Sequence, residues 1–224
     1  MSRIKLKDRV LPNYSRAEEI MNMTTHIVGA AIGLIALILC VVFAAKSGNG
    51  FAIASSIIFG ISMITLFTTS SIYHGLSPKL AAKKIFQILD HCAIFILIAG
   101  TYTPILLTTV INHRPNLAWF LLIAIWAVAI LGIVLNSIDL KKYKKFSMFC
   151  YLAMGWCVIF IAGDLINFLG PTAFSLLVAG GIVYTIGAIL YAIGKKKKYF
   201  HSVFHISVNI GSLLHILCII ILII

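Results

Sequence analysis

Charged residues are scarce in this 224-residue chain, and acidic residues are the scarcest. Aspartate, glutamate, lysine and arginine together make up 11% of the sequence, and only six residues are acidic. Soluble domains carry about a quarter charged residues, so this deficit excludes an ordinary soluble protein. Hydrophobic residues fill 61% of the chain, and the mean hydropathy is +1.07. This composition is typical of an integral membrane protein.

The chain also lacks a cysteine framework, long linkers and low-complexity tracts. It has five cysteines, but no CxxC pair, and all five fall in apolar stretches. We therefore interpret them as packing residues and expect no disulfide. No convincing internal repeat is visible, which disfavours a transporter built from two inverted halves. A single helical bundle is the simplest organisation.

Long apolar runs define the expected fold. Crossing ~30 Å of hydrocarbon takes about 20 helical residues, and Pro104 predicts a kink within one of the runs that are long enough. We predict an all-α integral membrane bundle of seven transmembrane helices in residues 27–224. Residues 1–26 form a cytoplasmic N-terminal segment, in which 14–26 could be an interfacial helix or a solvated leader. The seven predicted spans are 27–45, 51–74, 86–111, 117–136, 146–167, 172–193 and 202–224.

Basic residues predict the orientation of the bundle. Sixteen of the eighteen lysines and arginines fall in the N-terminal tail or in the loops after the second, fourth and sixth spans, against Lys46 and Arg114 on the other side. Basic loops stay cytoplasmic, so we expect a cytoplasmic N-terminus and an outside C-terminus in the cell (plasma) membrane. The formal charge of +12 lies in short loops, which favours anionic lipid headgroups over nucleic acid as partners.

Four ionisable residues lie at a similar depth in three different predicted spans. His74 precedes Lys79 by five residues, Asp90 follows Lys84 by six, and His201 and His205 follow Lys198 by three and seven. At ~1.5 Å per residue, all four lie within about two helical turns of the cytoplasmic boundary. Ionisable groups inside a membrane are costly and are usually functional.

Helical spacing suggests a metal site in this layer. Residues four apart share a helix face, which pairs His201 with His205 and Ser70 with His74. Two histidines from one helix and one from another make the three-ligand set of a catalytic zinc ion. The alternative is an interfacial or hydrogen-bonded histidine pair without metal. His91 points about 100° away from Asp90, so we expect only Asp90 to face the centre.

Other polar residues have simpler interpretations. His215 lies ten residues beyond His205, too deep to share the same ion, and we assign it and Asn209 to hydrogen bonds within the bundle. His26 opens the first span on the cytoplasmic side and is expected to contact lipid headgroups, with an approach to the histidine layer as the alternative. His113 should be solvated in an external loop, and Asp164 should lie near the external interface.

Several motifs in their order along the chain resemble one known family. They are "EEIMNMTTH" (18–26), "SSIYH" (70–74), "LDHCAIFILIAGTYTP" (89–104), "MGW" (154–156) and "HSVFHISVNIGSLLH" (201–215). The chain resembles hemolysin III-type membrane proteins, within the progestin and adipoQ receptor family and the wider superfamily of alkaline ceramidases. The resemblance implies a seven-helix fold with zinc near the cytoplasmic face. It assigns the metal ligands to His74, His201 and His205, and the accompanying polar residues to Ser70 and Asp90.

The same resemblance suggests the chemistry. Kinship with ceramidases implies a zinc-dependent hydrolase of a lipid amide bond, in which Asp90 acts as general base and Ser70 orients water or stabilises the oxyanion. Two other functions remain open at this point. One is a receptor-like or structural zinc protein, with Asp90 as a direct fourth ligand. The other is a cytolytic or pore-forming protein, although a water-filled pore needs polar residues at all depths, and the midplane here is nearly all apolar.

Overall fold

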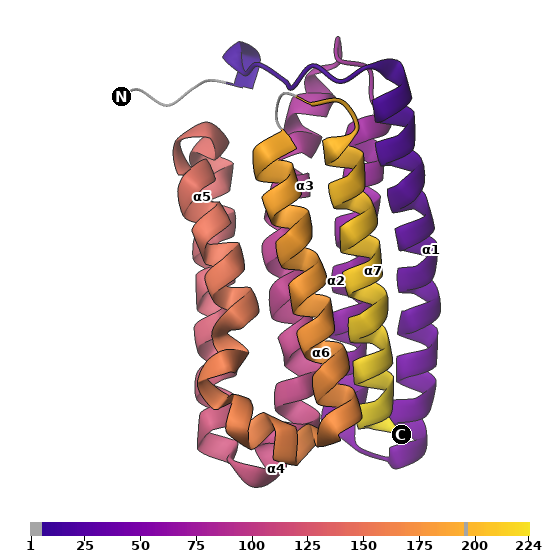
Figure 1. Ribbon diagram of the computed structural model, residues 1–224, viewed down its shortest axis with the longest axis vertical. Helices are drawn as coiled ribbons and strands as arrows, with labels where there is room; N and C mark the ends of the chain where they lie inside the picture. Colours follow the sequence, from indigo (N-terminus) through magenta and orange to yellow (C-terminus); the bar gives the residue numbers. More distant parts are fainter. Residues whose placement is uncertain (1–5, 195–196) are drawn as a thin grey trace.

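The computed structural model describes residues 6–194 and 197–224, and these form a bundle of long helices without any strand in the described ranges (Figure 1). Four of the basic residues used to predict orientation, Arg3, Lys5, Lys195 and Lys196, lie outside the described residues. The all-helical architecture predicted from the sequence is confirmed.

The first two long helices begin and end at clear local signals. A short 3-10 turn, η1 (Leu6–Asp8), precedes α1 (Arg16–Ser47). Ser15 and Glu18 form a capping box at the start of α1, and α1 ends at Gly48 in the left-handed conformation, with φ 66°. The Asn49 side chain caps α2 (Gly50–Gly75). Residues 16–26, expected as part of a separate N-terminal segment, are the first turns of α1.

The third helical run changes its winding at its proline. α3 spans Ala81–Pro104 and continues as a π-helical stretch, η2 (Ile105–Val110), followed by α4 (Ile111–His113). Proline lacks the backbone N–H that an α-helix needs at this position. The kink predicted at Pro104 therefore coincides with a change from α- to π-helix.

The next 79 residues, Pro115–Ile193, are almost continuously helical but contain two breaks. They comprise α5 (Pro115–Trp156), a 3-10 stretch η3 (Cys157–Ile161) and α6 (Ala162–Ile193). The backbone is non-helical at Asp139 and at Gly170, where φ is 76°, which favours glycine. In Figure 1 α5 turns back on itself at one end of the bundle, and the start of α6 runs across the other end before the helix rises along the bundle.

The final helix, α7 (Phe200–Ile223), runs to the end of the chain. Within the described ranges, five helical runs are long and apolar enough to cross a membrane: Arg16–Ser47, Gly50–Gly75, Ala81–His113, Pro115–Ile193 and Phe200–Ile223. Large apolar side chains also face outward, including Phe160, which is 89% exposed. The chain is therefore a multi-pass membrane protein.

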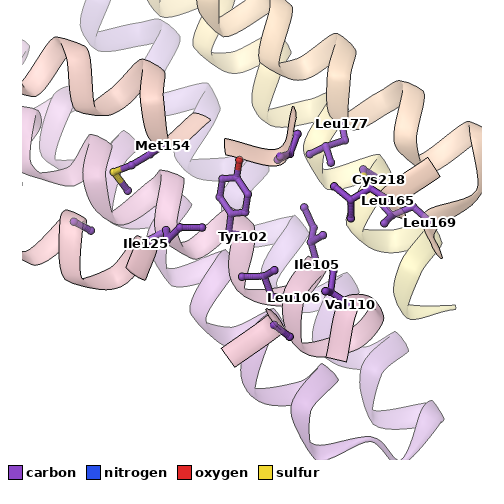
Figure 2. Close-up of a cluster of buried hydrophobic side chains, with 14 of the residues drawn as sticks. Tyr102, Ile105, Leu106, Val110, Ile125, Met154, Leu165, Leu169, Leu177 and Cys218 are labelled. Carbon is purple, nitrogen blue, oxygen red and sulfur yellow. The ribbon is translucent and has the colours of Figure 1, made fainter. Parts of the chain in front are cut away.

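Two apolar cores hold the bundle together. One lies among α1, α2, α3 and α7 and includes Phe59, Met63 and Phe67. The other joins α3 and η2 to α5 and α6, with Tyr102 and Leu177 among its residues (Figure 2). Glycines allow close approach in the first core, since a Cβ on Gly60 would come within 2.8 Å of the Leu37 backbone.

The helices α1 and α7 begin at the same end of the bundle. The Tyr199 backbone N–H, just before α7, donates to Glu18 Oε1 at 2.8 Å. The C-terminus lies at the opposite end of the bundle (Figure 1). The starts of α1 and α7 are therefore fixed side by side at one end.

Candidate metal centre

The last turn of α2 and the first turns of α7 bring three histidines together. His74 lies one residue before the end of α2, and His201 and His205 lie on consecutive turns of one face of α7. His74 and His205 are buried, and His201 is partly buried. The structure therefore unites the histidines that spacing and depth selected, although 127 residues separate His74 from His201.

The three imidazoles meet through the same ring nitrogen. His201 Nε2 lies 3.3 Å from His74 Nε2 and 3.0 Å from His205 Nε2. The potential ligand atoms all lie within 4.8 Å of one another. Tetrahedral zinc with Zn–N bonds of ~2.0–2.1 Å separates its nitrogen ligands by about 3.3–3.4 Å. The spacing of these nitrogens is close to that required.

Hydrogen bonds at the opposite ring nitrogens favour metal binding by two of these histidines. His74 Nδ1 lies 2.6 Å from Glu19 Oε2, and His205 Nδ1 lies 3.3 Å from the backbone oxygen of Asn22. Both oxygens act as acceptors, so each Nδ1 carries the proton and each Nε2 presents a lone pair. Lone pairs that face one another in a buried site need a cation or a proton between them.

His201 Nδ1 is buried and has no hydrogen-bond partner among the described residues, so it does not decide whether His201 Nε2 carries a proton or a lone pair. A proton shared among the Nε2 atoms is the alternative to a metal ion. The donor set, three neutral imidazole nitrogens, is one that zinc prefers. The residues present therefore fit a zinc ion.

Asp90 and Ser70 lie close to the histidines but do not bond to them. Asp90 is buried on α3, with Oδ2 3.5 Å from His91 Nδ1. Ser70 is fully buried on α2, one turn before His74, and its hydroxyl lies near the Asp90 carboxylate without a hydrogen bond in the described part of the chain. His91 Nδ1 also contacts the backbone oxygen of Gln87 at 2.9 Å.

Two cavities meet beside the cluster. The first, of about 180 Å³, is lined mostly by apolar side chains of α3, α5, α6 and α7 and reaches from His205 to Leu177 and His215. The second, of about 450 Å³, is more polar and is bounded partly by residues 8–12 and Tyr14. Asp90, His91 and His201 are among the residues that line both, so His91 faces this region as well as Asp90, contrary to the expectation from helical geometry. The histidine cluster therefore lies where an apolar cavity adjoins a polar recess.

The N-terminal segment covers this recess with an aromatic ring. The Tyr14 ring stacks on His201, with 5.0 Å between ring centroids and 17° between ring planes. Burial is the main cause that raises the pKa of the Tyr14 phenol well above its ordinary value. The ring therefore covers His201 as a neutral group.

The remaining predictions for polar residues have mixed outcomes. His26 does not contact headgroups as expected: it is buried and stacks on His205 with 3.7 Å between ring centroids, because its face of α1 packs against α7. His215 is bonded within the bundle as predicted, with Nε2 3.2 Å from the backbone oxygen of Leu177. The Asn209 amide donates to Thr25, also as predicted.

At the other end of the bundle, the structure extends the expectations for two residues. His113 is exposed as predicted, but its ring also stacks on Phe168 at 4.1 Å. The partly exposed Asp164 pairs with Arg114, with 2.6 Å between Oδ2 and the guanidinium nitrogen. Neither residue is part of the histidine cluster.

Sequence reasoning missed three residues that contact the cluster. Glu19 and Asn22 lie in the first turns of α1, and Lys83 lies in the first turn of α3. Ser202 donates to Asn22 Oδ1 at 2.6 Å, which joins α7 to α1 beside the histidines. The scarcity of acidic residues was an available signal, since Glu18 and Glu19 are two of only six in the chain.

The fold and the site define the class as a multi-pass helical membrane protein with a buried three-histidine cluster at one end of the bundle. The family model described as Haemolysin-III related matches residues 14–216. The chain belongs to this family.

Relatives in bacteria and animals agree with this assignment. The chain is 40% identical over 203 residues to Hemolysin-3 of Bacillus cereus, covering 90% of each chain. It is 40% identical over 202 residues to the Hemolysin-3 homolog of Bacillus subtilis, covering 90% of this chain and 92% of the relative. It is also 26% identical over 163 residues to human Monocyte to macrophage differentiation factor, covering 70% of this chain and 66% of the relative.

Proposed function

We propose that the protein is a zinc-dependent hydrolase of a lipid amide bond, such as that of a ceramide, with its metal site near the cytoplasmic face. The observation that carries the proposal is the convergence of three Nε2 atoms beside an apolar cavity. His74, His201 and His205 are the proposed metal ligands.

We further propose seven spans with a cytoplasmic N-terminus and an outside C-terminus. The breaks at Asp139 and Gly170 support this count, because they divide Pro115–Ile193 into three parts, each of which is long enough to cross a bilayer. An odd number of spans agrees with chain ends at opposite ends of the bundle. The lysine-rich loops support the orientation and anionic headgroups as partners, and we propose the plasma membrane as the location.

The chemistry needs an activated water and a proton carrier. Zinc in the site would supply Lewis-acid activation of the water and of the substrate carbonyl. The Asp90 carboxylate would accept a proton from the attacking water and return it to the leaving amine nitrogen. The Ser70 hydroxyl would donate a hydrogen bond to the oxygen on which negative charge develops. The amide C–N bond breaks, a C–O bond forms, and the products are a carboxylic acid and an amine.

The two cavities support an amphiphilic substrate. An acyl chain would fit the apolar cavity, while the polar part of the molecule and the water would use the polar recess bounded by Tyr14. Asp90 and His201, which line both cavities, lie where the amide would need to be. An ester in the same position is compatible with the same arrangement.

A zinc protein without catalysis is the second candidate. It is favoured by the lack of any hydrogen bond from Ser70 to the histidines among the described residues. In that case Asp90 would complete a closed four-ligand site, which is typical of structural zinc. The cytolytic alternative is retained because the Bacillus cereus relative bears the name Hemolysin-3. Lysis could then follow from lipid cleavage or from an oligomeric pore.

The deciding experiment measures zinc per polypeptide and ceramide hydrolysis on the same detergent-purified samples. We expect about one zinc and turnover in the wild type, loss of both in His205→Ala, and loss of turnover alone in Asp90→Asn. His113→Ala, an exposed histidine at the other end of the bundle, is the matched control and should retain both. Zinc without turnover in the wild type would favour the non-catalytic candidate, and folded wild type without zinc would contradict both.

A further inference from the structure

Glu19 connects the histidine cluster to a buried lysine. One oxygen of its carboxylate, Oε2, lies 2.6 Å from His74 Nδ1, and the other, Oε1, lies 2.7 Å from Lys83 Nζ. The Glu19 side chain is 17% exposed, whereas those of His74 and Lys83 are almost fully buried. A single carboxylate thus joins the ends of α2 and α3 that meet beside the first turn of α1.

Lys83 is buried deeply enough to require such a partner. Only 1% of its surface is exposed, and its ammonium group donates to Glu19, to the backbone oxygen of Leu76 at 2.9 Å and to that of His74 at 3.5 Å. It also lies 5.2 Å from the centre of the Tyr73 ring. An uncompensated buried ammonium is strongly unfavourable. The interaction with Lys83 therefore holds Glu19 in place, with its second oxygen directed at His74.

The three histidines differ in what contacts their Nδ1 atoms. His74 has the charged Glu19 at 2.6 Å, His205 has a neutral backbone oxygen at 3.3 Å, and His201 has no partner in the described chain. A carboxylate that accepts from the far nitrogen of a metal-binding histidine fixes its ring and tautomer and makes the near nitrogen more basic. Among the three, His74 is the most firmly oriented ligand.

We propose that Glu19, held by Lys83, is a positioning residue that sets the affinity of the histidine cluster for its metal. This inference rests on the proposed metal site and adds a residue that determines how tightly the site binds zinc. Glu19 contacts neither substrate nor metal in this arrangement. It acts through His74, and Lys83 acts through Glu19.

The test compares zinc affinity in three variants of the full-length protein in detergent. Glu19→Gln removes the charge with little change in size. Glu19→Gln combined with Lys83→Met also removes the buried ammonium. The matched control is Asp164→Asn, which also removes one carboxylate charge, because Asp164 pairs with Arg114 at the other end of the bundle from the histidines. For each variant we would measure the zinc Kd by chelator competition, the visible spectrum with cobalt, and the Tm without metal.

We expect Glu19→Gln to weaken zinc binding about 10- to 100-fold and to shift the cobalt spectrum, with Asp164→Asn staying within about twofold of wild type. The double variant should recover Tm lost by Glu19→Gln, yet remain weak in zinc binding. Recovery of Tm without recovery of zinc affinity distinguishes a positioning role of Glu19 from a purely structural one.

Two results would overturn the inference while leaving the proposed function intact. One is an unchanged zinc Kd and cobalt spectrum in Glu19→Gln. The other is a double variant that regains zinc affinity together with its Tm. Wild-type protein that binds no zinc would instead contradict the proposed function itself, so the two failures are distinguishable.

Discussion

The two ends of α7 bury histidines in different ways. In its first two turns, His201 and His205 direct their Nε2 atoms toward His74 from a second helix. Ten residues further along, His215 directs its Nε2 atom to the backbone oxygen of Leu177. Both regions place imidazoles in an apolar bundle, but only the first makes nitrogen lone pairs converge. The relative direction of the ring nitrogens therefore distinguishes a candidate metal site better than burial does.

The neighbouring helices explain this difference. The first turns of α1 supply Glu19 and Asn22, which occupy the Nδ1 atoms of His74 and His205 and leave their Nε2 atoms free. His215 instead packs against Gly180 and the Tyr184 ring. No second imidazole faces it among the described residues. A polar first turn on one neighbouring helix is what makes the cluster suitable for a metal.

The largest expected difference separates two alanine variants of the same helix. His201→Ala removes one of three proposed ligands, and we expect zinc affinity to fall by more than about 100-fold, beyond the usual effect of losing an outer-shell partner. His215→Ala should retain about one zinc per chain, because its ring contacts none of the three histidines. Metal analysis of both purified variants checks this comparison. Equal zinc loss in the two folded variants would contradict it.

A smaller effect is expected from the space around His215. A Cβ on Gly180 would lie 2.4 Å from the His215 ring, whereas nothing lies within 4 Å of one on Gly155. Gly180→Ala should therefore destabilise the protein by about 1–3 kcal/mol through overpacking. Gly155→Ala is the matched control and should be neutral or stabilise by up to about 1 kcal/mol, since alanine favours helix.

Thermal unfolding in detergent measures both glycine variants. The Gly180→Ala protein should still bind zinc, because Gly180 lies on α6 beside His215 and away from the three proposed ligands. A Tm for Gly180→Ala equal to that of Gly155→Ala would contradict the prediction, because it would show that the His215 ring moves aside without loss of stability.

Local sequence features predicted much of this architecture. Helical spacing paired His201 with His205, and flanking lysines placed His74 at a similar depth, because both signals depend on residues close along the chain. The break at Gly170 falls between the predicted spans 146–167 and 172–193.

The contacts that complete the site could not be predicted in this way. Glu19 lies 55 residues from His74 and 64 from Lys83 in sequence, and their meeting depends on how α1 packs against α2 and α3. The burial of His26 depends in the same way on which face of α1 meets α7. Hydrophobic periodicity and composition describe one helix at a time. Contacts between residues of different helices therefore follow only from the tertiary structure.

The smallest expected effect tests whether the N-terminal segment contributes to zinc binding at the histidine cluster. Tyr14→Leu removes the ring stacked on His201, and aromatic pairs contribute about 0.5–1.5 kcal/mol beyond their buried area. We therefore expect zinc binding to weaken by about 2- to 10-fold. Tyr14→Phe keeps the ring and loses only a neutral hydroxyl, so it should match the wild type. Zinc titrations of both variants check this expectation. An unchanged zinc Kd in Tyr14→Leu would contradict it and would show that the Tyr14 ring does not contribute to zinc binding.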